Sequence, residues 1–126
     1  MEKEKIEEMK QRGVNLWKGL DTITSGRMEL GELVHLYSQP HRKYHNLQHI
    51  HDSLKEMDEV YHSIKNPSEV EMAIWYHDAI YDTKRDDNEE KSAELAWDRL
   101  YKTGLSGYFI NDVKSMILAT KHNGND

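Results

Sequence analysis

The strongest constraint on the fold is a run of apolar residues that recur at steps of three and four after Asn46. This spacing puts about one apolar residue per helical turn on a single face, which predicts a long amphipathic helix. The residues of this face are Leu47, Ile50, Leu54, Met57, Tyr61 and Ile64. No segment of the sequence sustains the alternation of apolar and polar residues that a half-buried strand needs. We therefore expect an all-α protein.

Five further segments carry helical spacing between residues that begin or end helices. Asn66 and Pro67 suit the N-cap and the first position of a helix. The residue before Pro40 is displaced from the α region, so a helix should end before it. Together with the run after Asn46, the predicted helices cover approximately residues 3–20, 27–38, 47–64, 67–81, 88–104 and 107–121. We expect one domain over 1–126, folded as a compact bundle of five to six helices.

Composition excludes several classes of function. The formal net charge of −6 argues against extensive nucleic-acid binding, because phosphate backbones require clustered lysine and arginine. The chain has no cysteine, so a transition-metal site would have to use imidazole and carboxylate groups. No segment is apolar over the length that a bilayer requires, and the N-terminus lacks a signal-peptide stretch. We expect no membrane association and a cytoplasmic location.

The adjacent pair His77 and Asp78 is the first candidate for chemistry. On the predicted helix, His77 shares a face with Ala73 and Ile74, so its imidazole should point into the bundle, and Asp78 flanks the same surface. A carboxylate directed towards a core is costly unless it is paired or binds a metal. The competing interpretation is a buried histidine that is simply hydrogen-bonded to an aspartate. For the isolated pair, that structural interpretation is favoured.

Two other histidine elements change this assessment. His45 and His49 are four residues apart, which on a continuous helix places them one turn apart on one side. His122 follows the last predicted helix, where a histidine can also simply complement the helix dipole. Imidazoles and a carboxylate from three helices that meet at one point would form a metal site inside a bundle. The ordered set of His45, His77 with Asp78, and His122 therefore predicts a metal site, although each element alone does not.

Four blocks of the sequence carry these residues in a recognisable order. The blocks are Tyr44–Ile50, Ala73–Tyr81, Asp87–Ala93 and Ile117–His122. They resemble the HD superfamily of metal-dependent phosphohydrolases, and in particular its branch of small, mostly uncharacterised bacterial and phage-borne members. The resemblance covers about residues 36–122 as a metal-site core, preceded by an N-terminal helix at about 3–20. It implies an HD-domain-like bundle.

The resemblance also implies a metal-ligand set. The ligands would be His45, His77, Asp78 and His122, with His49 as a less favoured occupant of the first position or a supporting residue. They would bind one or two divalent transition-metal ions, with manganese, iron, nickel, cobalt and zinc as the candidates. The expected reaction is hydrolysis of a phosphate ester or anhydride by a metal-activated water. The expected partner is a small phosphorylated molecule, specifically a nucleotide.

Further residues receive roles from their positions beside these ligands. Asp82, one turn beyond Asp78 on the predicted helix, would act with it in catalysis by orienting water or donating a proton. Glu89 could support an imidazole or substitute for a ligand, although a helix-capping role explains it equally well. Arg42 and Lys121 stand beside proposed ligands and suit phosphate oxygens.

The family pattern closes with an aspartate on a later helix, and the sequence to Asp126 contains no segment that matches it. Either the protein is longer, or it is a natural short form, or Asp82 or Glu89 replaces that ligand. Two other functions stay open. One is a di-iron oxygenase, which the wider superfamily contains. The other is a non-catalytic helical binding module with an incomplete metal site, whose exposed face would favour a homo-oligomer.

Overall fold

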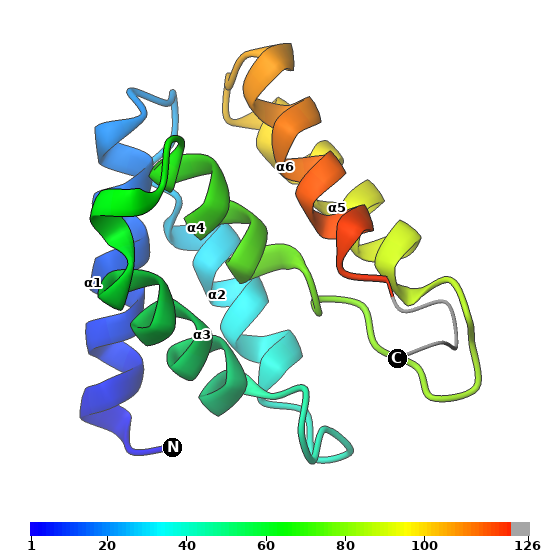
Figure 1. The fold of residues 1–126 in the computed structure, drawn as a ribbon. Helices are drawn as coiled ribbons and strands as arrows, with labels where there is room; N and C mark the ends of the chain where they lie inside the picture. The colour runs from blue at the N-terminus through cyan, green and yellow to red at the C-terminus, as the bar shows by residue number, and fades with distance from the viewer. Residues whose placement is uncertain (122–126) are drawn as a thin grey trace.

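The computed structural model describes residues 1–121, and within that range the chain contains helices and no strands. The elements are α1 (Lys3–Gly19), α2 (Arg27–Tyr37), α3 (Leu47–Glu59), the short 3-10 helix η1 (Tyr61–Ser63), α4 (Pro67–Tyr76), α5 (Asn88–Lys102) and α6 (Gly107–Ala119). The expected all-α bundle is confirmed. Helices α1 to α4 lie together, and α5 and α6 form a pair beside them (Figure 1). No helix within residues 1–121 has both the length and the apolar character to cross a membrane.

Helix α4 is the central element of the bundle. It packs against α3, α5 and α6, whereas the longest helix, α1, packs mainly against α2. The core of the bundle contains large aromatic side chains. Those that are fully buried are Trp17, Tyr37, Trp75 and Tyr76. Because α4 is enclosed on several sides, the residues that follow its C-terminus lie where several elements of the bundle meet.

Two helices end earlier than the apolar spacing predicts. Helix α3 ends at Glu59, and Tyr61, which the spacing places on the buried face, is 47% exposed in η1. Here the chain tightens into a 3-10 turn, in which the Ser63 N–H donates to the Val60 carbonyl at 2.8 Å. Helix α4 ends at Tyr76, so the prediction that it continues through residue 81 is wrong. The physical reason for this second end lies in the contacts of the candidate site.

Gly26 allows the chain to enter α2 directly against the buried indole of Trp17. Its φ is +79°, and a Cβ at this position would lie 2.4 Å from two indole atoms. We expect Gly26→Ala to lower the free energy of unfolding by roughly 1–3 kcal/mol, because the new methyl group adds backbone strain and overpacks the core. Urea denaturation measures the change.

The matched control for this prediction is Gly31→Ala, inside α2. A Cβ at Gly31 would have no neighbour within 4 Å. This variant should be more stable by up to about 1 kcal/mol, because alanine favours a helix interior over glycine. Equal stability of Gly26→Ala and the wild-type protein would contradict the predicted close contact with Trp17.

Candidate metal centre

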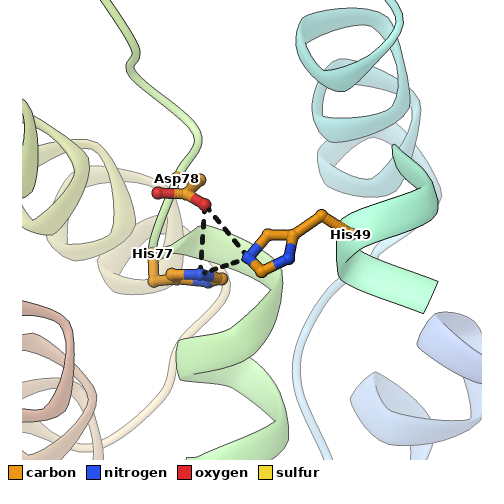
Figure 2. A group of neighbouring side chains, drawn as sticks. All are labelled: His49, His77 and Asp78. Carbon is orange, nitrogen blue, oxygen red and sulfur yellow. Dashed lines mark hydrogen bonds and ion pairs between the residues drawn. The ribbon is translucent and has the colours of Figure 1, made fainter. Parts of the chain in front are cut away.

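One carboxylate oxygen meets three imidazoles just beyond the C-terminus of α4. Oδ2 of Asp78 lies 3.1 Å from Nδ1 of His45, 3.4 Å from Nε2 of His49 and 3.2 Å from Nε2 of His77. The Nε2 atoms of His49 and His77 are 3.4 Å apart. Figure 2 shows His49 reaching from α3 towards the pair at the end of α4. The structure thus brings the histidine block at residues 44–50 into contact with the His-Asp pair.

Three of these side chains could hold a metal ion. His49, His77 and Asp78 each offer one ligand atom, and these atoms all lie within 4.8 Å of one another. His45 hydrogen-bonds to Asp78 but does not belong to this group. The group thus includes His49, which the sequence ranked second at the first position, while the predicted ligand role of His45 stays a prediction.

The start of α3 explains why His49 rather than His45 enters the group. Asn46 is the N-cap of α3, and its side chain accepts a hydrogen bond from the His49 N–H at 3.1 Å. His45 therefore precedes the helix, in agreement with the predicted start after Asn46, and the two histidines do not lie one turn apart on one continuous helix. His49 projects from the first turn of α3. His45 instead lies beside the ring of Tyr81, with the ring centroids 4.3 Å apart.

The end of α4 sets the geometry of the His-Asp pair. In a continuing helix, the N–H of Asp78 would donate to the carbonyl of Ile74. Instead, the Ile74 carbonyl accepts from Nδ1 of His77 at 2.7 Å, and the Asp78 N–H donates to the hydroxyl of Tyr37 at 3.2 Å. A carbonyl can only accept, so this hydrogen bond places a proton on Nδ1. In its neutral form with this proton on Nδ1, the His77 ring would present the lone pair of Nε2 to a metal ion.

Arg42 ties together the two segments that carry the ligands. Its side chain is buried, and its guanidinium donates to the carbonyls of His45 at 3.0 Å, Asp78 at 2.7 Å and Ala79 at 2.6 Å. It also lies over the ring of Tyr37, 5.1 Å from the ring centroid. Both main-chain polar groups of Asp78 are therefore held, the N–H by Tyr37 and the carbonyl by Arg42.

The electrostatics of the group favour an ionised carboxylate. Burial alone would raise the pKa of Asp78, but its hydrogen bonds with His49, His77 and His45 hold that pKa well below its usual range. Burial disfavours the proton on His77, yet the hydrogen bond and the charge of Asp78 outweigh it and raise the pKa of His77. A carboxylate that is 18% exposed thus faces nitrogen atoms that bind either protons or a metal ion.

Comparison with protein-family models, with curated proteins and with solved structures gave no match for this chain. What the group can bind therefore follows from its own atoms. Two imidazoles and one carboxylate are ligands suited to divalent transition metals. Three protein ligands, counted among residues 1–121, would leave coordination positions for water or a substrate atom, as in catalytic rather than structural metal sites.

Other predicted site residues make different contacts. Because α4 ends at Tyr76, Asp82 does not lie one helical turn beyond Asp78, and that premise of its predicted role is wrong. Asp82 is exposed, and its carboxylate accepts from the N–H of Lys84 at 2.9 Å. Nζ of Lys121 donates to both carboxylate oxygens of Glu90, at 3.0 and 2.8 Å.

The predicted roles of three further residues stay predictions. Glu89 lies in the first turn of α5 and is not among the three residues of the metal group. The contacts of Arg42 are with main-chain carbonyls, so its predicted role in phosphate binding gains no support from them. His122 lies outside the described residues. Sequence reasoning missed the part played by Tyr37, because no local pattern indicates the partners of its hydroxyl.

Proposed function

We propose that this chain is a metal-dependent hydrolase of phosphate esters or anhydrides, with His49, His77 and Asp78 as the metal ligands. The observation that carries the proposal is the meeting of two distant sequence blocks at Oδ2 of Asp78, which creates a three-ligand group. Within the part of the chain that the structure describes, this group has the ligand number of catalytic sites. The order of the blocks along the chain, which resembles that of HD phosphohydrolases, supports hydrolysis over other metal chemistry.

The side chains around the metal group would have different roles in such a reaction. A divalent ion bound there would lower the pKa of water and polarise a phosphoryl oxygen. The hydrogen bond between His77 and Ile74 orients the ligand nitrogen. His45, whose side chain is 40% exposed, contacts Asp78 without belonging to the ligand group. In this proposal, His45 would move a proton to the leaving oxygen.

The experiment is a metal-dependent activity screen. The protein is stripped with a chelator, loaded separately with manganese, iron, cobalt, nickel or zinc, and assayed for phosphate release. Nucleoside mono-, di- and triphosphates and simple phosphate monoesters and diesters serve as substrates. We expect release only from metal-loaded protein, and a loss of at least about 100-fold in His49→Ala because a ligand is removed.

The matched control is His35→Ala, which removes an exposed histidine of α2. This variant should keep wild-type activity, because His35 is not part of the metal group. Phosphate release that persists without metal, or in the absence of the His49 imidazole, would contradict the proposed function.

The same preparations separate the two other functions. Turnover that requires oxygen after anaerobic iron loading would identify an oxidative enzyme. Retention of less than about half a metal ion per chain after loading, measured by elemental analysis, would favour a non-catalytic module, because a site that lacks ligands binds metal weakly.

A further inference from the structure

A cavity of about 330 Å³ opens between α3, α4 and α6. Its apolar wall consists of Val70, Ala73 and Ile74 from α4 and Met116 from α6. None of the described residues that line it is a lysine, an arginine, an aspartate or a glutamate. A concave apolar surface with few polar groups is typical of a small-molecule site.

His77 connects this cavity to the metal group. The imidazole lines the cavity, while its Nε2 lies 3.4 Å from His49 and 3.2 Å from Asp78. His77 is therefore the ligand through which a molecule bound at the metal group could also reach the cavity, whose lining does not include His49 or Asp78. Ile74 also links the cavity to the metal group: it lines the cavity, and its carbonyl accepts from Nδ1 of His77.

Among the described residues, the polar groups that line the cavity are too few to recognise a nucleotide base or sugar. The hydroxyl of Thr120 donates to the carbonyl of Ile117 at 2.6 Å, which uses its proton within α6. The remaining polar side chains in the lining are Ser53 and His77. A base or sugar on this surface would find few protein partners for its donors and acceptors, whereas an uncharged hydrocarbon group needs none.

We propose that the cavity binds the apolar part of the substrate, and that the substrate class is alkyl or aryl phosphate esters rather than nucleotides. The proposal rests on the proposed function for the position of the phosphoryl group. At about 30 Å³ for each water-sized atom, the volume admits on the order of ten non-hydrogen atoms. That is the size of a small aromatic ring system or a short alkyl chain.

The test compares two phosphonates, which carry no hydrolysable ester bond, so it measures binding without turnover. Methylphosphonate and phenylphosphonate are titrated into manganese-loaded protein by calorimetry. We expect phenylphosphonate to bind at least about tenfold more tightly, because its ring leaves water for the apolar cavity. Met116→Gln should remove most of this preference and leave the affinity for methylphosphonate unchanged. Met116→Leu, the apolar control, should keep the preference.

Each outcome bears on a separate claim. Equal affinity for the two phosphonates in the wild-type protein would overturn the cavity proposal and leave the metal-dependent function standing. Binding of neither compound to the loaded protein would overturn both. A phenyl preference that survives in Met116→Gln and also in Val70→Asn would place the ring elsewhere and overturn the cavity proposal. Circular dichroism establishes whether each variant is folded. If Met116→Gln does not fold, Val70→Asn alone tests the cavity proposal.

Discussion

Asp78→Asn is expected to abolish metal retention, with a loss of affinity greater than about 100-fold. Oδ2 of Asp78 is the atom that lies within 3.4 Å of nitrogen atoms from His45, His49 and His77. Asparagine has nearly the same shape but no charge, so it cannot balance a divalent cation. Competition with a fluorescent chelator measures the affinity, and elemental analysis after dialysis measures the retained metal.

Thermal unfolding separates a ligand role for Asp78 from a purely structural one. A metal that binds only the folded protein raises its melting temperature with concentration. We expect this rise in the wild-type protein and in the control Asp58→Asn, which alters an exposed carboxylate paired with Arg12 at 2.7 Å. We expect no rise in Asp78→Asn. A metal-dependent rise in Asp78→Asn equal to that of the control would contradict the assignment of Asp78 as a ligand.

The metal-free Asp78→Asn variant should remain folded but be less stable than the wild-type protein near neutral pH. The pKa of Asp78 is lowered in the folded state, so its ionised form contributes stability above the ordinary carboxyl range, and that contribution is lost as the pH falls. Should the variant fail to fold, His49→Ala provides the same test. Its side chain is 39% exposed, so the fold depends on it less.

The number and placement of the helices could be predicted because their signals are local. Pro67 begins α4 at its first position, and Gly104 follows the end of α5 with a φ of +86°. Both residues act through their own backbone preferences, which depend on the residue type alone. The apolar spacing then assigned each helix a buried face without any knowledge of its neighbours.

The end of α4 could not be predicted because it depends on residues distant in the sequence. The apolar pattern continues to Tyr81, and no glycine or proline interrupts it. The helix nevertheless stops, because Nδ1 of His77 donates to the Ile74 carbonyl and the Asp78 N–H donates to the hydroxyl of Tyr37 in α2. This competition between side-chain and main-chain hydrogen bonds directs the His-Asp pair towards α3. The spacing of apolar residues gives no sign of it.

The presence of His49 rather than His45 in the metal group is a different case, because the sequence contained a signal for it. Asparagine is a preferred N-cap, and the predicted helix already began after Asn46. Had that boundary been applied to the histidines, His45 would have fallen outside the helix and His49 in its first turn. The local rule was sufficient for this part of the site, whereas the approach of His49 to His77 needed the three-dimensional fold.

Arg42→Lys is expected to weaken metal binding by about 10–100-fold while the chain remains folded, the effect typical of lost support behind a metal ligand. The guanidinium spans the carbonyls of His45, Asp78 and Ala79. A lysine ammonium is a single point charge and cannot reproduce this planar fork. The carbonyl of Asp78 would lose its donor, and the carboxylate would no longer be held towards the imidazoles. Chelator competition on the folded protein measures the change.

Arg99→Lys is the control that distinguishes positioning from general stability. Arg99 also forms a forked interaction, with its Nε and Nη2 at 2.8 and 2.9 Å from the Glu32 carboxylate, but it joins α5 to α2 and does not contact the metal group. This variant should lower the unfolding midpoint without changing metal affinity. Tyr37→Phe, which removes only the hydroxyl that accepts from Asp78, should weaken metal binding as Arg42→Lys does. Unchanged metal affinity in both site variants would show that Arg42 and Tyr37 support the fold alone.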